Sequence, residues 1–205
     1  GEPALLFGYF AVLNGVILAL ALSKAWRALN VLGFVFTFGL GLAWGWHYYG
    51  PEHFAVVQPF LALFFVFYVG IAILYAFKAP LLLKAPVDGL LVFGVPLVGF
   101  ALQTGIVRDF PYGVAWSAIA LGAIYAVLWL VLRRRLEAGL QLLASAFLAL
   151  AVIFGTLAIP YAADPQWTTA WWSLEAAAVY WIGCRQRRHL ARGFALLLQV
   201  AAALA

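Results

Sequence analysis

The fold is decided by residues 113–132, which read GVAWSAIALGAIYAVLWLVL and contain no charged side chain. Three arginines, Arg133, Arg134 and Arg135, follow this stretch directly. A membrane-spanning helix needs about 20 consecutive apolar residues. Because backbone groups in lipid must find their hydrogen bonds within the protein, such a segment favours a helix. The stretch therefore predicts a spanning helix that ends at a basic turn.

Apolar runs of similar length occur along the whole chain. None of them shows the strict alternation of polar and apolar residues that marks a barrel strand. We therefore expect an all-α fold, a polytopic transmembrane helix bundle with about eight membrane-spanning helices in a single region, 1–205. The predicted spans are 4–22, 29–46, 57–77, 88–104, 113–132, 139–160, 165–184 and 190–205.

The composition leads to the same class of protein. The chain has 205 residues, of which 67% are hydrophobic and only 9% are charged. Soluble domains carry about 25% charged residues, so this chain cannot cover a water-exposed surface. The net charge of +5 comes from basic residues that lie between apolar runs. We attribute that charge to membrane topology and expect no nucleic-acid partner.

The basic residues also predict the orientation. All but Arg108 lie in the connections after the first, third, fifth and seventh runs. The positive-inside rule places these connections in the cytoplasm and the first residue outside, as in a multi-pass protein of the bacterial inner membrane. The arginines near the last two of these connections are candidates for binding anionic lipid headgroups, at about 1 kcal/mol each. They are Arg133, Arg134, Arg135, Arg185, Arg187, Arg188 and Arg192.

Three local features refine the expected bundle. Pro96 lies inside the run 88–104 and should kink that helix. Gly41 and Gly45 have a GxxxG spacing suited to close helix contact. Asp164 precedes Pro165 as a predicted N-cap of the seventh helix. The sequence contains no Met and its last apolar run is short, so we expect an internal fragment of a longer chain.

Aromatic side chains gather near the predicted outer ends of the helices. Anchoring at the membrane interface explains them, and a platform for carbohydrate or quinone is the alternative. They are Trp44, Trp46, Tyr48, Tyr49, Tyr112, Trp116, Trp167, Trp171 and Trp172.

Glu175 is the most unusual residue of the predicted spans. It lies about ten residues, or roughly 15 Å, from either end of the run 165–184, at the bilayer midplane. A charged group there costs about 2.5 kcal/mol or more unless it faces protein or water. A proton relay, a cation site or a contact to a polar substrate would use it. Alternatively, it is a protonated carboxyl that bonds a neighbouring helix, for example through Asn14 or Gln199.

The first and seventh runs suggest an internal repeat. Aligning Arg27 with Arg188 places Asn14 on Glu175, so each polar residue lies at mid-helix before a basic turn. This pattern is either a parallel helical-hairpin repeat, as in transport folds, or a coincidence of similar hairpins. For Asn14 itself, a hydrogen bond between helices is the ordinary use.

The predicted outer connections hold the remaining polar candidates. A metal site needs three or four ligands that converge on one point. An ordinary role as polar residues at the membrane interface explains the candidates of these connections better, so we expect no metal and no cofactor. Cys184 is the only cysteine, which excludes an intramolecular disulfide. No phosphate loop, nucleophile elbow or zinc-binding helix motif occurs, so no catalytic residue is assigned. The outer-face candidates are His47, Glu52, His53, Arg108, Asp109 and Asp164.

Several longer segments resemble a known family of bacterial polytopic inner-membrane proteins, domain of unknown function 2339. The segments are 6–14 (LFGYFAVLN), 26–30 (WRALN), 172–178 (WSLEAAA), 183–186 (GCRQ) and 190–194 (LARGF) with Gln199. The resemblance implies a larger protein with many more helices. Ala176 departs from the pattern, where Gly is more usual. The family brings no reaction or substrate, so the resemblance supports the placement and leaves the activity open.

Three functions remain open from the sequence. The first is transport or lipid handling, suggested by Glu175, Asn14 and the kinked fourth helix. The second is a scaffold subunit of a membrane complex, suggested by the short loops. The third is a membrane enzyme that acts on lipid-linked glycan with His47, His53, Asp109 or Asp164. The expected partners are membrane lipids, with further helices of the same protein or other membrane subunits as additional candidates.

Overall fold

The computed structural model describes residues 3–23, 27–78, 89–134 and 138–162, together with 196–197 and 199–200. Within this part every regular element is helical, which confirms the all-α fold. Six of its helices are long and apolar enough to cross a membrane. The predicted runs 165–184 and 190–205 lie outside the described residues, apart from the four positions near the end.

Five of the long helices begin and end within three residues of the predicted spans. The helices are α1 (Pro3–Ser23), α2 (Arg27–Tyr48), α3 (Phe54–Lys78), α5 (Val95–Val107), α6 (Gly113–Leu132) and α7 (Ala138–Ala162), with a 3₁₀ turn η1 (Pro51–His53) and a π-helical turn η2 (Leu90–Gly94). In the fourth span, 88–104, the turn η2 and the helix α5 together cover residues 90–107.

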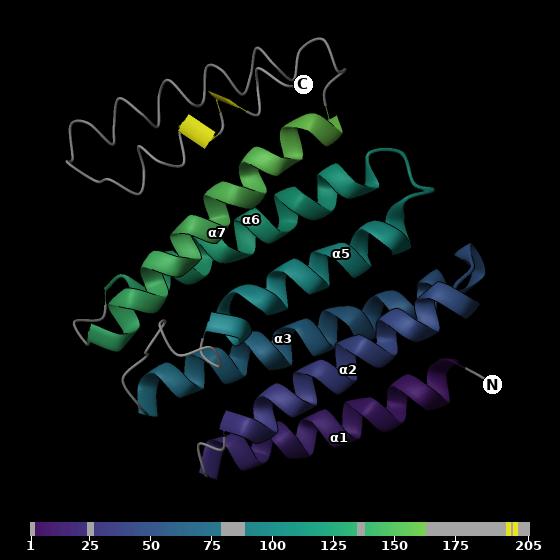
Figure 1. Cartoon of the computed structure of the whole chain (residues 1–205), viewed down its shortest axis with the longest axis horizontal. Helices are drawn as coiled ribbons and strands as arrows, with labels where there is room; N and C mark the ends of the chain where they lie inside the picture. The colour runs from purple at the N-terminus through teal and green to yellow at the C-terminus, as the bar shows by residue number, and fades with distance from the viewer. Residues whose placement is uncertain are drawn as a thin grey trace.

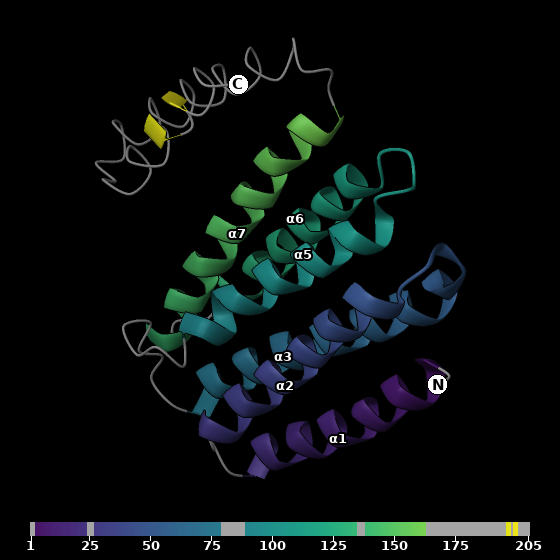
Figure 2. The same ribbon diagram turned by 45° about the vertical axis from the view of Figure 1, so that its right-hand side comes forward.

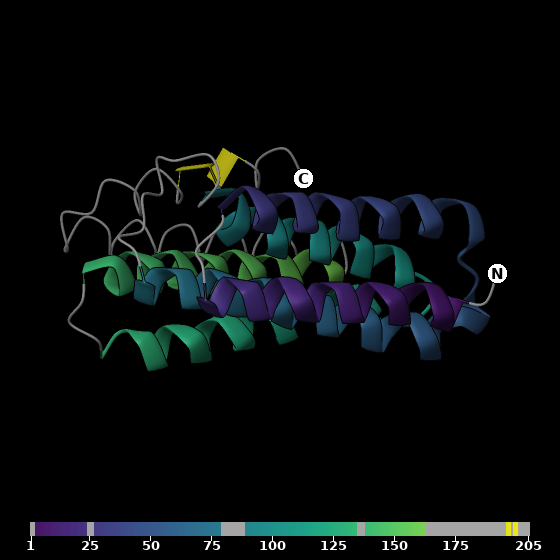
Figure 3. The same ribbon diagram turned by 90° about the horizontal axis from the view of Figure 1, so that it is seen from below.

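The helices lie side by side with their axes roughly aligned (Figure 1). The order across the bundle is α1, α2 and α3, then α5, then α6 and α7, and the turned view keeps this order (Figure 2). Seen from below, the helices occupy more than one layer, with α2 above α1 and α3 (Figure 3). We call the end that carries η1 and the turn between α5 and α6 the outer end, because the charge distribution predicts it to lie outside the cell.

The closest helix contact occurs between α6 and α7 at Gly122. A Cβ atom on Gly122 would lie 3.3 Å from both Ala151 O and Gly155 N, so the two backbones approach directly over this glycine. The predicted contact at Gly41 and Gly45 is wrong. A Cβ atom on either residue would meet nothing within 4 Å, because both glycines border a cavity instead of a neighbouring helix.

The kink at Pro96 stays a prediction, and the structure shows a π-helical turn just before this proline. η2 ends at Gly94, and Pro96 then lies in the first turn of α5. A proline has no N–H to donate and is tolerated in the first turn of a helix. The change from π to α geometry just before Pro96 thus places the proline where its missing donor costs little.

Candidate functional site

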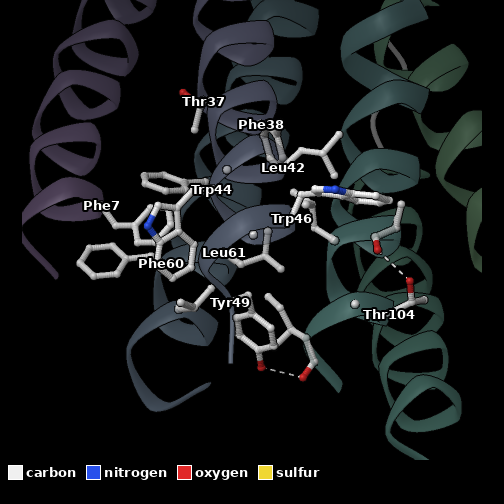
Figure 4. Close-up of a pocket in the computed structure, with 18 of the residues that line it drawn as sticks. Phe7, Thr37, Phe38, Leu42, Trp44, Trp46, Tyr49, Phe60, Leu61 and Thr104 are labelled. Carbon is white, nitrogen blue, oxygen red and sulfur yellow. Dashed lines mark hydrogen bonds between the residues drawn. The ribbon is translucent and has the colours of Figure 1, made fainter. Parts of the chain in front are cut away.

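A cavity of about 500 Å³ lies in the outer half of the bundle, between α2, α3 and α5, with Phe7 of α1 at its edge. This volume falls within the range of about 300–1,000 Å³ that is typical of ligand pockets. Figure 4 shows Thr37 at one end of the cavity and Tyr49 at the other. Thr37 and Gly45 are eight positions apart on α2. The cavity therefore extends roughly 12 Å along this helix, from near its outer end towards the middle of the membrane.

The walls of the cavity are mainly aromatic. Phe7 packs edge-on against Trp44, with ring centroids 5.1 Å apart, and its centroid lies 5.8 Å from that of Phe60. Gly41 and Gly45 of α2 line the cavity and have no side chains, so neither residue fills part of the space. Such a surface suits an apolar chain or ring and offers it few polar contacts.

The deep end of the cavity meets a buried network of three polar side chains from three helices. Asn14 of α1, only 2% exposed, donates from Nδ2 to Thr37 Oγ1 at 2.9 Å and to Phe10 O at 2.8 Å. Tyr68 of α3 donates from its hydroxyl to Asn14 Oδ1 at 2.6 Å. Thr37, the member of the network that lines the cavity, also lies 3.1 Å from Asn14 Oδ1. These bonds tie α1, α2 and α3 together near the middle of the membrane.

Gly33 makes room for this network. A Cβ atom on Gly33 would lie 2.8 Å from the Tyr68 hydroxyl and 2.8 Å from Ile17 Cδ1. Gly33 precedes Thr37 by one helical turn, so both residues lie on the same face of α2. The face of α2 whose Thr37 binds Asn14 therefore also needs a residue without a side chain at Gly33.

The mouth of the cavity is polar. Tyr49 donates from its hydroxyl to Ile106 O at 2.8 Å, which satisfies one of the carbonyls left unpaired at the end of α5 (Figure 4). Partial burial raises the pKa of the Tyr49 hydroxyl, and the carboxylate of Asp109 raises it further. Arg108 lines the cavity and forms an exposed ion pair with Asp109, with 3.7 Å between Nε and Oδ2. The mouth thus offers charges of both signs and a phenol.

The other predicted outer candidates do not converge on one point. His47 ends α2 on an exposed position and contacts Ala43 O of its own helix at 3.0 Å. His53 and Glu52 contact each other in η1, with 3.5 Å between Nδ1 and Oε1. Within the described residues no group of three or more His, Cys, Asp and Glu side chains could hold a metal ion.

The remaining predicted residues are placed as follows. Arg133 and Arg134 are exposed beyond the end of α6 that is opposite the outer end, and the Arg133 guanidinium lies 4.7 Å from the centre of the Trp129 ring. Gln199 is helical and exposed. Asp164, Arg135, Glu175, Arg185, Arg187, Arg188 and Arg192 lie outside the described residues.

Sequence reasoning found Asn14 but missed its partners. Thr37 and Tyr68 are common residues in apolar runs, and neither breaks the hydropathy pattern of its helix. The available signal was position, because Thr37 lies near the middle of its run, as Asn14 does. Choosing Tyr68 from several tyrosines required the three-dimensional packing.

Comparisons with known proteins bear on the family alone. Neither the curated proteins nor the solved structures gave a significant match. One family model matches residues 1–205, and its description is "Predicted membrane protein (DUF2339)". Because that match covers the whole sequence, the chain belongs to the DUF2339 family of predicted membrane proteins.

Proposed function

We propose that this protein binds and handles an amphipathic small molecule, a lipid or a lipid-like compound, in the outer half of the membrane. The observation that carries the proposal is the aromatic cavity that runs from Arg108 and Tyr49 at its mouth to Thr37 at its deep end. A dry bundle that served only as a scaffold would have no need of such a space.

The chemistry of the cavity matches the two parts of an amphiphile. The aromatic walls favour an apolar chain or ring, because burying apolar surface is stabilising. Arg108, which pairs with Asp109, lines the mouth and can contact a polar headgroup at the level of the interface. The Thr37 hydroxyl lies at the far end and donates to Asn14 Oδ1, so a hydroxyl group carried deep into the cavity could donate a hydrogen bond to Thr37 Oγ1.

Glu175 belongs to this proposal as a residue for movement of the bound molecule. Its predicted midplane position suits a group that takes up or releases a proton during transport. Glu175→Gln in the full-length protein is expected to leave folding and binding unchanged and to abolish transport. If the Glu175→Gln variant still transports the molecule, the proton-carrier role is wrong. The proposal that the cavity binds the molecule is not affected by that result.

The cavity itself is tested by filling it. The full-length protein in lipid nanodiscs is irradiated with a phospholipid that carries a diazirine on its acyl chain, and the labelled residues are mapped by mass spectrometry. We expect labels on Phe38, Leu42 and Phe64. Gly41→Leu should reduce them about tenfold or more, because forcing a side chain into an occupied space costs about 1–3 kcal/mol.

Gly39→Leu is the matched control. Gly39 lies on the same helix, is exposed to the lipid side and has nothing within 4 Å of its Cβ position. We expect this variant to keep the labels inside the cavity. Equal labelling of Phe38, Leu42 and Phe64 in the two leucine variants would show that the lipid binds elsewhere.

A further inference from the structure

A second cavity, of about 370 Å³, lies between α3, α5 and α6. It is separate from the first cavity, and Leu61 of α3 lines both. Its lining includes the exposed side chains of Val66, Trp116 and Ile124, so it opens towards the lipid around α3 and α6. This cavity is therefore accessible from the bilayer.

Three uncharged polar side chains line this cavity, and two of them already have partners. Gln103 Nε2 donates to Ser117 Oγ at 3.2 Å, and Ser117 Oγ donates to Gly113 O at 2.8 Å. Gln58 Oε1 is buried and accepts no hydrogen bond from the described part of the protein. A buried acceptor without a donor is costly, so Gln58 would gain a partner by turning its amide oxygen towards a donor in this space.

The position of these groups in the membrane narrows the class of ligand. Gln58 lies in the second turn of α3, Gln103 near the end of α5 and Ser117 in the second turn of α6. Each of the three lies four residues, or roughly 6 Å, from the outer end of its helix. This is the depth at which the hydrocarbon core gives way to the polar backbone of the lipids. Among the residues that the structure describes, no charged side chain lines the cavity, so a charged headgroup would lose its hydration without gaining a partner from them.

We propose that the second cavity binds an uncharged lipid with a free hydroxyl, of the diacylglycerol class. The lipid hydroxyl donates its proton to Gln58 Oε1 in a hydrogen bond. Gln103 and Ser117 face the rest of the polar backbone. The acyl chains leave past Val66 and Ile124 into the bilayer. This site is distinct from the aromatic cavity and does not depend on the function proposed for it.

The test compares two lipids that differ in the hydroxyl hydrogen. The full-length protein in phosphatidylcholine nanodiscs is irradiated with a diazirine-bearing diacylglycerol or with its O-methyl ether, which cannot donate. We expect labels on Ala62, Ala120 and Leu121, about fivefold to tenfold stronger for diacylglycerol than for the ether. Equal labelling by the two lipids would overturn the proposal.

Variants connect the preference to the residue. Gln58→Met keeps the length of the side chain but removes the acceptor, and it should abolish the difference between the two lipids. Ala120→Leu fills the cavity from the lipid side and should reduce labelling by both. Ser145→Ala is the control: this residue lies on α7, away from both cavities, and its hydroxyl donates to Gln141 O of its own helix, so the variant should behave like the wild type. A preference that survives Gln58→Met would also overturn the proposal.

The same experiment separates this site from the first cavity. Gly41→Leu should leave diacylglycerol labelling at Ala120 unchanged, since Gly41 lines only the aromatic cavity. If the labelling experiment on the aromatic cavity contradicts the proposed function while diacylglycerol still labels Ala120, only the second site is real. If the aromatic cavity is labelled and Ala120 is not, only the first site is real.

Discussion

The Tyr68 hydroxyl lies 2.6 Å from Asn14 Oδ1, and this hydrogen bond joins α3 to α1 beside Thr37 of α2. Tyr68 is fully buried, and its ring centroid lies 5.7 Å from the centroids of both the Phe34 and the Phe38 rings, which pack edge-on against it. The bond thus connects helices inside a mainly apolar environment, where low local polarity strengthens a hydrogen bond.

Tyr68→Phe is expected to destabilise the bundle by about 0.6–1.7 kcal/mol, the range found for hydrogen bonds between membrane helices. The ring and its packing remain, so the loss reports the hydroxyl alone. The measurement is unfolding of the full-length protein in mixed micelles with increasing denaturing detergent. Tyr9→Phe, at an exposed position of α1, is the control, and an equal effect of the two substitutions would contradict the role of the bond.

Gly33→Ala is expected to break the same bond by steric means. The new methyl group would lie 2.8 Å from the Tyr68 hydroxyl, so the tyrosine ring must move away from Asn14. Stability should fall by about 1–3 kcal/mol, as for other insertions into a packed core. The loss should shrink when Gly33→Ala is added to Tyr68→Phe, because the hydroxyl is then absent.

Gly39→Ala is the matched control for that experiment. It lies on the exposed side of the same helix with open space at its Cβ position, so the substitution should be neutral or slightly stabilising. Fully additive losses in the double variant would mean that Gly33 acts through Ile17 instead of Tyr68.

The sequence predicts the helices of this protein well because lipid imposes one dominant constraint. A run such as 113–132 must be apolar, long and helical, and its predicted ends are the observed ends of α6. The face that each helix turns to its neighbours is much harder to predict. In lipid both the buried and the exposed faces are apolar, so Leu143, fully buried, and Leu142, exposed, look alike in the sequence.

The glycines show the same difficulty at the level of single residues. Gly41 and Gly45 have the spacing of a contact motif but line a cavity, whereas Gly122, without that spacing to another glycine of α6, makes the close contact. Spacing places residues on one face of a helix, and only the packing decides whether another helix lies against that face.

Gly122→Ala is expected to push α6 and α7 apart. Its Cβ atom would lie 3.3 Å from Ala151 O and from Gly155 N, and both atoms belong to backbone that cannot rotate away. We expect a loss of about 1–3 kcal/mol in the detergent unfolding experiment. Gly155→Ala, across the same contact, points into open space and should be tolerated. Equal effects of the two alanines would show that the helices do not cross at Gly122.

Tyr49→Phe is expected to loosen the contact between the end of α2 and the end of α5, at about 0.5–1.5 kcal/mol, by removing the donor to Ile106 O. The pKa of Tyr49 is raised above its ordinary value of 10.0 in the folded state, mainly by burial and then by Asp109. A raised pKa means that this stabilisation is complete below pH 10 and is lost as the pH rises through the folded-state pKa.

The pH dependence distinguishes the hydroxyl from a general packing effect. The wild type should be more stable than Tyr49→Phe at neutral pH, and the difference should decline above about pH 10. Tyr48→Phe is the control, because the neighbouring tyrosine is exposed on α2. A difference that stays constant through the alkaline range would show that ionisation of Tyr49 does not affect the contact.

The orientation of the bundle is tested by cysteine labelling from the two sides of the membrane. Cys184, the one cysteine of residues 1–205, is first replaced by Ser, together with any cysteine elsewhere in the full-length protein. Glu52→Cys then places one thiol on the exposed turn η1, and Arg134→Cys places one on the exposed residue after α6. A membrane-impermeant maleimide added to intact cells should label the first variant and not the second, because basic connections remain in the cytoplasm. Labelling of Arg134→Cys alone would invert the topology, and both cavities would then open in the inner half of the membrane.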